Sequence, residues 1–409
     1  MLADALRYHV GPPLMVVGVT AGVQVLAVAG GKNTTRGWSL LGSLEAWCYV
    51  AALALWGLLS LWVPSREFRG PMPQHGPAPR YRANGVQFYC VSVILAIVGL
   101  IYNQEFASRT FYIFPEILAA CNVTALVFCV YLLIRGKKWP QTTEKLPPRP
   151  IVYEFYRGME IHPRFLGVDV KQFTVCRFGM IAWQVLVIIF FVAQNRLHGF
   201  DFACFVCAFL QSVYIAKFFY WETGYFDTLD IIYDRAGYYI CWGCLVFVPG
   251  FYTFTSFFLV AHKPTVSVSG AFVCLMMGLI SIALNYRVDW EKQYFRQNKG
   301  KCFLWGRQAK FIKATYVTPA NEKRTSLLLT SGCWGLARHL NYVFELLLTL
   351  SWSLVGIGRG LGPFLYFFFL TILLVHRIFR DEEKCKAKYG RYWDQYCEAV
   401  PYRLIPFIF

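Results

Sequence analysis

The chain has 409 residues, of which 57% are hydrophobic and 18% aromatic, while only 15% are charged. This composition leaves too little polar surface to cover a soluble globule of this size, so it excludes an ordinary soluble domain and predicts an integral membrane protein. A formal charge of +17 would favour nucleic-acid binding in a soluble chain. Because the basic residues here follow a membrane topology, no nucleic acid is expected as a partner.

Apolar stretches of about the 20 residues needed to cross a bilayer recur along the whole chain. Ten are predicted, near 13–31, 45–63, 88–105, 112–134, 176–194, 201–219, 239–261, 269–286, 343–358 and 361–376. The last two are short enough that one re-entrant hairpin is an alternative to two spans. The predicted fold is therefore an all-α bundle of about ten transmembrane helices.

Basic residues are concentrated in alternate connections between these stretches. The rich segments are 66–82, 137–171, 287–338 and 377–403, whereas the other connections hold few Lys or Arg. Because loops rich in Lys and Arg stay in the cytoplasm, these segments are predicted to be cytosolic. An even number of spans then places both termini on the same side.

Fourteen cysteines are scattered through the apolar segments. Two CxxC spacings, Cys204 with Cys207 and Cys241 with Cys244, lie inside predicted spans and lack nearby histidine pairs. Buried structural thiols are therefore predicted, and no metal site is expected.

The connection after the sixth predicted span, "WETGYFDTLDIIYDRAGYY", is unusually acidic. It carries Glu222, Asp227, Asp230 and Asp234 beside several tyrosines. A solvated hairpin explains these carboxylates as well as a functional role does. Ionisable groups that lie against apolar surface are costly, however, and tend to be kept for a task.

Three late clusters combine cations with aromatic side chains. They are Lys292 with Arg296, four residues apart on a predicted helix; residues 338–342; and residues 380–389. The glycine-rich motifs of soluble nucleotide-binding proteins are absent from the sequence. A nucleotide with a 2′-phosphate would therefore be held by side chains, and lipid headgroups explain the same charges equally well.

Several long motifs in these regions resemble one known family. "LLLTSGCWGLARHLNY", "LLLVHRIFRDEEKCKAKYG" and "YCEAVPYRLIPFIF" are similar to signatures of the sterol reductases, a family that includes Δ14-sterol reductases, 7-dehydrocholesterol reductases and the lamin B receptor. The resemblance runs from about Ala83 to Phe409. It suggests a division into weakly matching N-terminal spans with a Pro-rich loop (1–82), a transmembrane core with sterol-site candidates (83–286) and a C-terminal NADPH-binding region with the last spans (287–409).

This resemblance implies a ten-helix enzyme of the endoplasmic reticulum membrane that reduces a sterol ring double bond with NADPH in a cytosol-facing pocket. "FRQNKGKCFLWGR" and "DRAGYYICWGCLVFVP" are more similar to the Δ7 members, the 7-dehydrocholesterol reductase group, than to the Δ14 members. A sterol substrate and membrane lipids are the implied ligands, and other sterol-pathway enzymes are candidate partners. The alternatives are a Δ14-sterol reductase, a non-enzymatic sterol-binding or scaffold protein, and a methyltransferase of the isoprenylcysteine type, which resembles the C-terminal portion alone.

The family's cofactor positions carry over onto matching residues of this chain. The implied NADPH contacts are Lys292, Arg296, Leu329, Trp334, Asn341, Tyr342, Asp381, Cys385, Lys386, Ala387, Lys388, Tyr389 and Tyr396. One position departs from the family pattern, because many members follow the Asn-Tyr pair with a small residue and an aspartate. This chain has Phe344 and Glu345 there, which predicts a shifted substrate position or an altered substrate choice.

Reduction of an electron-rich ring alkene by hydride requires a proton first, so a buried acid is expected. The candidate proton donors are Glu222, Asp230, Asp234, Tyr238, Tyr239 and Glu345, with His339 also near the implied cofactor site. Burial or a tyrosine network would raise the pKa of such a group. The sequence gives these candidates equal standing.

Overall fold

The structure is a computed structural model, and it describes residues 2–31, 40–71, 78–141, 147–317 and 323–409. Its contacts divide the chain into two compact units. Unit 1 comprises Met1–Thr265 and Gly358–Pro363, and unit 2 comprises Val266–Ile357 and Phe364–Phe409.

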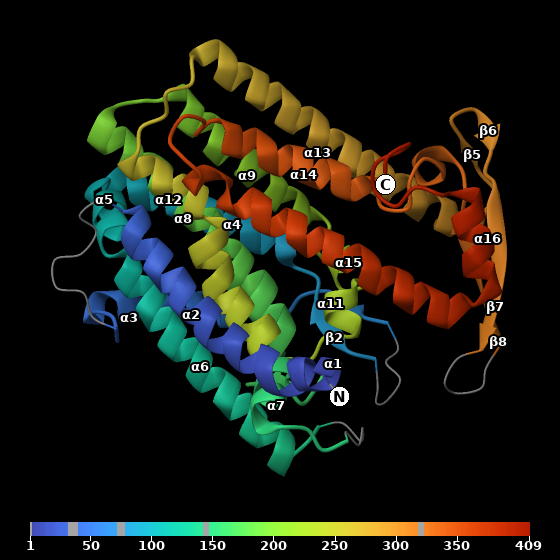
Figure 1. Cartoon of the computed structure of the whole chain (residues 1–409). Coiled ribbons are helices and arrows are strands. Elements are labelled where there is room, and N and C mark those ends of the chain that lie inside the picture. The colour runs from blue at the N-terminus through green and yellow to red at the C-terminus, as the bar shows by residue number, and fades with distance from the viewer. Residues whose placement is uncertain (1, 32–39, 72–77, 142–146, 318–322) are drawn as a thin grey trace. The chain divides into compact units, whose positions relative to one another are not determined.

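Unit 1 is built almost wholly from helices. They are α1 (Leu2–Ala5), η1 (Leu6–Val10), α2 (Gly11–Gly30), α3 (Leu44–Trp62), α4 (Gly85–Tyr102), α5 (Glu105–Tyr112), α6 (Phe114–Lys138), α7 (Ile151–Arg157), η2 (Gln172–Gly179), α8 (Met180–His198), α9 (Phe202–Tyr220), α10 (Glu222–Tyr225), α11 (Leu229–Ile232), η3 (Tyr238–Tyr252) and α12 (Phe254–Ala261). Two short hairpins, β1 (Glu67–Arg69) with β2 (Arg80–Arg82) and β3 (Arg164–Phe165) with β4 (Val168–Asp169), lie in the connections. Helices α2 and α6 lie side by side (Figure 1).

The centre of unit 1 is formed by η2 with α8 and by η3 with α12, the two most buried spans. Here η2 and η3 are π-helical, and η3 contains Pro249, whose missing N–H interrupts the normal helical bonding. Indole groups link the spans, because Trp183 Nε1 donates to Gln211 Oε1 and Trp242 Nε1 donates to Asn122 Oδ1, both at 2.8 Å. Such bonds satisfy polar groups that have no water to bind inside a bilayer.

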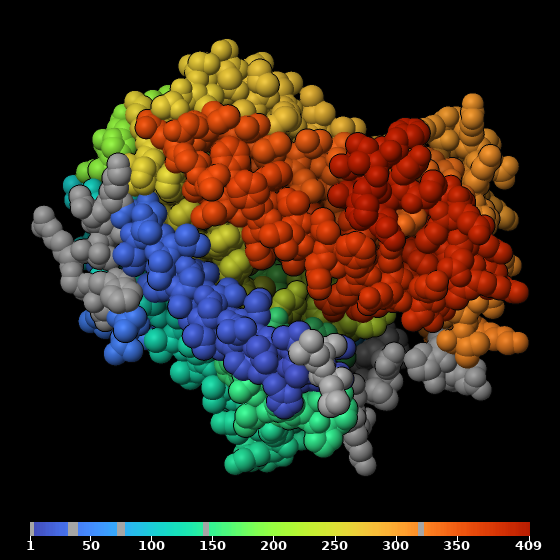
Figure 2. Space-filling view, in the orientation of Figure 1, coloured from blue at the N-terminus to red at the C-terminus, as the bar shows by residue number. Residues whose placement is uncertain are grey.

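Unit 2 combines long helices with two hairpins. Its elements are α13 (Val268–Gln297), β5 (Phe303–Leu304), β6 (Arg307–Gln308), β7 (Phe311–Val317), β8 (Lys323–Leu329), η4 (Gly332–Gly335), α14 (Leu340–Leu354), α15 (Leu365–Tyr389) and α16 (Arg391–Ala399), and η5 (Gly362–Phe364) precedes α15. Strands β7 and β8 are antiparallel, with Phe311 opposite Leu329. Helix α16 packs on β7, and Figure 2 shows the red C-terminal segment beside the orange strands.

The prediction of a mostly helical membrane protein is confirmed. In the described part of the chain, nine helices are long and apolar enough to cross a membrane. The predicted segment 343–358 corresponds to α14, which has 15 residues and so spans about 22 Å at 1.5 Å per residue, short of a ~30 Å hydrocarbon core. The predicted segment 361–376 is the first half of a span that continues to Tyr389.

The two CxxC pairs do not form disulfides. Cys204, Cys207 and Cys241 are buried free thiols, and Cys244 is half-buried. Cys207 lies 3.7 Å from the Ser256 hydroxyl, inside the packed helices of unit 1. These positions agree with the structural role that the sequence predicts for them.

Candidate functional site

The first two predicted cofactor clusters meet in unit 2. Lys292 is half-buried on the last turns of α13, and its Nζ lies 3.8 Å from the centroid of the Trp334 ring. The indole is fixed at its other edge, where Nε1 donates to the carbonyl of Val288 at 2.9 Å. A desolvated ammonium on an aromatic face gains about 2 kcal/mol. Trp334 therefore holds a positive charge in place beside α13.

The turn that carries Trp334 is attached to α13 by Glu291, a residue that the sequence analysis did not single out. The Glu291 carboxylate is fully buried and accepts hydrogen bonds from the Cys333 N–H and from Trp305 Nε1, both at 2.8 Å. Arg287 pairs with the same carboxylate at 3.3 Å. Glu291 thus connects α13 to both β5–β6 and η4. Val288 lies three residues before Glu291 and Phe295 four residues after it, a spacing that places all three on the buried face of α13 and was the available signal.

Gly332 leaves room for this carboxylate. Its φ is +62°, and a Cβ atom there would lie 2.5 Å from Glu291 Oε2. Gly306 also has a positive φ, +75°, but a Cβ atom there would meet nothing within 4 Å. The two glycines therefore share a backbone requirement and differ in their surroundings.

We expect Gly332→Ala to lower the free energy of unfolding more than Gly306→Ala does. Both variants carry the cost of a positive φ, about 1–2 kcal/mol. Gly332→Ala also displaces the carboxylate that binds Cys333 and Trp305, which adds about 1–3 kcal/mol. Thermal unfolding of the detergent-solubilised variants measures the difference, and equal losses would contradict the role assigned to Glu291.

Asn341 contributes a polar group that has no partner in the described part of the structure. Its Nδ2 is 3.3 Å from Asp289 Oδ1, while its Oδ1 is buried without a hydrogen bond. Asn285, on α13, donates to the Asn341 carbonyl at 2.9 Å and to Glu345 Oε1 at 3.3 Å. Leaving a buried amide oxygen unbonded costs about 1–3 kcal/mol. A ligand with an N–H group would satisfy it.

The third predicted cluster, residues 380–389, contacts the second cluster through Asp381 of α15. Asp381 Oδ2 is 3.3 Å from His339 Nε2, and the His339 ring stacks on Tyr342 with centroids 5.3 Å apart. Asp381 and Lys292 also interact electrostatically. The structure thus brings Lys292, Trp334, Asp381 and Tyr342 into one neighbourhood, and Arg296 lies one turn beyond Lys292 on α13.

Four of the remaining predicted contacts lie at an aromatic cluster against β7 and β8. Tyr396 and its neighbours Cys385 and Tyr389 pack with buried Trp393. Burial raises the pKa of the Tyr396 phenol, which therefore stays protonated at neutral pH. Lys388 Nζ lies 4.6 Å from the Tyr316 ring centroid.

The other three predicted contacts lie outside this cluster. Lys386 and Ala387 are exposed on α15, and Lys386 pairs with Asp394 at 3.2 Å. Leu329 ends β8 in the core around Trp334. Glu382, on the same helix as Lys386, binds arginines from other segments.

Arg338 connects α15 to the C-terminal segment that follows α16. Its guanidinium donates to Glu382 Oε1 from Nη2 at 2.6 Å and to the carbonyls of Val400 and Pro401 from Nη1 at 2.6 and 3.1 Å. Arg403 Nε donates to the other Glu382 oxygen at 2.9 Å. The cation that precedes α14 therefore fastens α15 and the C-terminal segment around the site.

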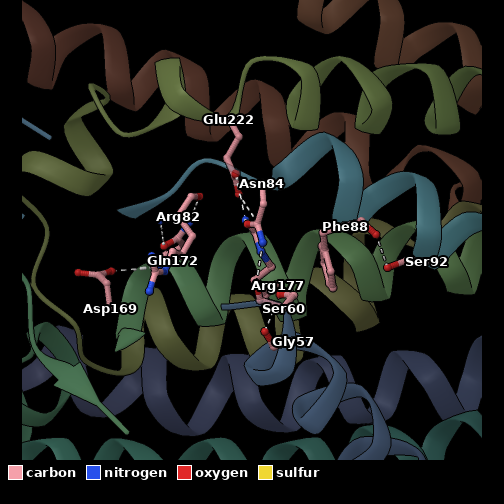
Figure 3. Close-up of polar contacts among 10 residues, drawn as sticks. All are labelled: Gly57, Ser60, Arg82, Asn84, Phe88, Ser92, Asp169, Gln172, Arg177 and Glu222. Atoms are coloured by element: carbon pink, nitrogen blue, oxygen red, sulfur yellow. Dashed lines mark hydrogen bonds and ion pairs between the residues drawn. The ribbon is translucent and has the colours of Figure 1, made fainter. Parts of the chain in front are cut away.

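In unit 1, two of the candidate proton donors are bound to arginines. Glu222 and Arg177 are both almost fully buried and form a two-pronged ion pair, and Arg177 Nη2 also donates to Asn84 Oδ1 at 2.8 Å (Figure 3). Asp234 is fully buried and lies 2.8 Å from Arg157 Nη1. An arginine partner stabilises the ionised carboxylate. Both carboxylates are thus engaged by arginine side chains.

The other unit 1 candidates lie nearby in the chain. Tyr238 begins η3, and its hydroxyl is 2.9 Å from Thr20 Oγ1 and donates to the Val16 carbonyl at 3.3 Å. Tyr239 is half-buried, with its ring 6.0 Å from that of Tyr156. Asp230 is half-buried on α11, and its carbonyl accepts a bond from Lys171. Among the proton-donor candidates of unit 1, Tyr238 and Tyr239 are thus the two tyrosines, and Asp230 is the third carboxylic acid beside Glu222 and Asp234.

The fold and this neighbourhood define a multi-pass membrane protein whose C-terminal unit gathers cations, aromatic rings and an unsatisfied amide oxygen. The sequence profile described as the "Ergosterol biosynthesis ERG4/ERG24 family" matches residues 32–409. The chain belongs to this family of sterol reductases.

Several relatives are similar over most of their length. A protein of Arabidopsis thaliana named 7-dehydrocholesterol reductase is 40% identical over 391 residues, covering 95% of this chain and 88% of the relative. A 7-dehydrocholesterol reductase of Xenopus laevis is 32% identical over 86% of this chain and 76% of the relative. A Delta(14)-sterol reductase of Methylotuvimicrobium alcaliphilum is 32% identical over 91% of this chain and 84% of the relative. The class of reaction is thus reduction of a sterol.

Proposed function

We propose that this protein reduces the C7=C8 double bond of Δ5,7-sterols such as 7-dehydrocholesterol, with NADPH as cofactor, in sterol biosynthesis. The observation that carries the proposal is the 40% identity over 391 residues with the Arabidopsis relative that has this name. Identity to the relative named for Δ14 reduction is lower, 32% over 377 residues. A Δ14-sterol reductase is therefore the second candidate, and a sterol-binding or scaffold protein without turnover is the third.

The residues around Trp334 fit the proposed cofactor. Lys292 and Arg296 offer cations for phosphate, and Asn341 Oδ1 offers a buried acceptor that needs a donor. Tyr342 is half-buried beside the His339 ring, and Asp381 binds that histidine. When bound, NADPH supplies the hydride. The chain's own side chains must then orient the dinucleotide, exclude water and deliver a proton.

We propose that the outlying contacts hold the ends of the same molecule. Lys386 and Lys388 are exposed cations on α15, and Tyr389 and Tyr396 hold α15 and α16 against β7–β8. Cys385 and Leu329 supply apolar surface, and the exposed Ala387 separates the two lysines in the sequence. Recognition of a 2′-phosphate would fall to these lysines and to Arg296, because phosphate is held by side-chain cations where no glycine-rich turn exists.

The proton donor that the geometry favours is Glu345. It lies one helical turn after Asn341 on α14, and Asn285 donates to both residues through the same Nδ2 atom. Asn285 is a neutral donor to Glu345, whereas Glu222 and Asp234 each lie against an arginine. Tyr238, Tyr239 and Asp230 are the next candidates. Protonation of the ring alkene gives a carbocation that accepts hydride.

We expect Glu345→Gln to lower kcat by about 10²–10⁴-fold, the usual size of a general-acid contribution. The affinity for NADPH should stay within about twofold, because glutamine keeps the size of the side chain and its bond to Asn285. Glu345→Asp, which retains the acid, is the matched control and should keep most of the activity. Unchanged kcat in Glu345→Gln would transfer the role to Tyr238 or Tyr239.

The substrate is tested by sterol profiling in cells that lack their own Δ7 reductase. Expression of the protein should deplete 7-dehydrocholesterol and produce cholesterol, as followed by mass spectrometry. Depletion of a Δ14-sterol with no change in the Δ5,7-diene would favour the second candidate. An unchanged sterol profile, together with intact NADPH binding by the purified protein, would favour the third.

We further propose the endoplasmic reticulum membrane as the location, with both termini in the cytosol. The basic connections that support this orientation include the segment 287–338, which carries Lys292 and Arg296. A cytosolic position of these residues would give NADPH direct access to the site. Protease protection of terminal tags in intact microsomes tests the orientation.

A further inference from the structure

Unit 1 contains a polar pocket that belongs to none of the residues discussed as cofactor or proton-donor candidates. Its volume is 310 Å³, within the range of small-ligand sites. It lies where α3 ends, with Leu61 and Trp62 on one side and Gln172, the first residue of η2, on another. All three arginines of its lining come from two short hairpins.

The hairpins form fixed walls on either side of the end of α3. Gln172 accepts from the Arg82 N–H at 3.0 Å and donates to the Arg82 carbonyl at 2.7 Å, which attaches β2 to η2 (Figure 3). Trp62 Nε1 donates to the Leu166 carbonyl at 3.0 Å, which attaches the tip of β3–β4 to α3. Leu166 and Gly167 have φ of 49° and 81°, as a tight two-residue hairpin turn requires.

The pocket lies at the boundary of a membrane-spanning segment. Trp62 ends α3, one of the candidate spans, and Gln172 begins another. Trp62, Val63 and Leu166 are exposed large hydrophobic residues at this level. Tryptophan with exposed aliphatic side chains at the end of a span is typical of the zone where lipid headgroups meet the acyl chains.

The lining carries both signs of charge. Arg82 is tied to the wall by its bonds to the Leu61 carbonyl at 3.3 Å and to Glu67 at 3.4 Å. Arg80 and Arg164 are exposed, and they contact Glu67 at 3.9 Å and the Gly167 carbonyl, respectively. Asp169 is buried at the inner end and accepts the Gln172 N–H at 2.9 Å. Two exposed guanidinium groups and an inner carboxylate match a ligand that itself has an anionic and a cationic group.

Lys171 and Arg164 are the cations that act on the Asp169 carboxylate, and together they do not offset the effect of its burial. Burial and the nearby Lys171 lower the pKa of His162 to about 3, so its imidazole is neutral at pH 7. Lys171 itself points to the end of α11, where its Nζ donates to the carbonyls of Asp230, Ile231 and Asp234. Burial raises the pKa of the Asp169 carboxyl, and a neighbouring ammonium group would offset this effect.

We propose that this pocket binds the headgroup of a zwitterionic phospholipid, with the phosphate on Arg80 and Arg164 and the ammonium group on the side of Asp169. Arginine forks suit phosphate oxygens, and the exposed Trp62 and Leu166 side chains provide a path for the acyl chains. A free phosphate ester offers the same anionic group without the chains. The site would make the lipid a structural ligand that holds the two hairpins and α3 together.

The test is native mass spectrometry of the detergent-purified full-length protein with added phosphatidylethanolamine, phosphatidylglycerol or glycerophosphoethanolamine. We expect one phosphatidylethanolamine to stay bound, and the Arg80→Gln/Arg164→Gln double variant to bind it at least tenfold more weakly. Arg66→Gln/Arg69→Gln, which removes two exposed arginines of the same loop outside the pocket, is the matched control and should bind as the wild type does. An unchanged thermal unfolding curve without added lipid shows that the double variant is folded.

Three results would overturn the proposal. Equal retention of phosphatidylethanolamine by both double variants would remove the lipid from the pocket. Equal retention of phosphatidylglycerol by the wild type would contradict the match to a zwitterion. Equally tight binding of glycerophosphoethanolamine would identify a soluble phosphate ester as the ligand.

Discussion

Arg177→Met is expected to lower the free energy of unfolding by about 3–5 kcal/mol, because it leaves the Glu222 carboxylate buried without its partner. Both side chains of the pair are at most 3% exposed, and Asn84 joins them to α3 through a 2.6 Å bond from its Nδ2 to the Ser60 carbonyl. Loss of the guanidinium thus loosens η2, α10 and α3 together. Thermal or denaturant unfolding in detergent measures the effect.

Two further variants separate this explanation from a general intolerance of change in unit 1. Arg177→Met combined with Glu222→Met removes both charges and should recover most of the lost stability, since no unpaired charge remains. Arg196→Met breaks an exposed pair with Glu105, 3.2 Å long, and should cost at most about 1 kcal/mol. A single Arg177→Met variant as stable as the wild type would refute the role of the pair.

Lys292→Ala is expected to weaken NADPH binding by about 10–100-fold, which corresponds to the 1.5–3 kcal/mol of a hydrogen bond to a charged group. The lysine is held over Trp334, so the ordering of its side chain is already complete before a phosphate binds. Isothermal titration of the purified variant with NADPH measures the loss.

Two further substitutions serve as controls for this variant. Lys292→Arg keeps the charge and should retain most of the affinity, while Lys301→Ala removes an exposed lysine just beyond α13 and should have little effect. Because Arg296 is proposed to bind the 2′-phosphate, Arg296→Ala should weaken the binding of NADPH more than the binding of NADH. Wild-type affinity in Lys292→Ala would remove α13 from the proposed cofactor site.

The sequence predicts the membrane helices well because each needs only a long apolar run. The hairpins are different, since β3 and β4 have two residues each and their pairing depends on Leu166 and Gly167 adopting positive φ. The predicted last span stops at 376, because charged residues follow it, although the helix continues to Tyr389. Charges end an apolar pattern without ending a helix, so α15 extends beyond the part that hydropathy detects.

The candidate site was predictable at the level of its clusters of cations and aromatic side chains. Lys292 and Trp334 were expected to share a neighbourhood, and their side chains are 3.8 Å apart. The structural role of Arg338 could not be predicted from the motif around it, because its partners Glu382 and Val400 lie 44 and 62 residues away in the sequence. Glu291 was missed because a buried carboxylate and an exposed one look alike in a helical pattern.

The most direct test of the proposed activity is a coupled measurement on purified protein in lipid nanodiscs. With 7-dehydrocholesterol and NADPH, we predict that one NADPH is oxidised for each conjugated diene lost, with cholesterol as the product. A Δ14-sterol offered under the same conditions should be reduced far more slowly. Oxidation of NADPH with the Δ14-sterol alone, or no turnover of the Δ5,7-diene despite NADPH binding, would contradict the assignment.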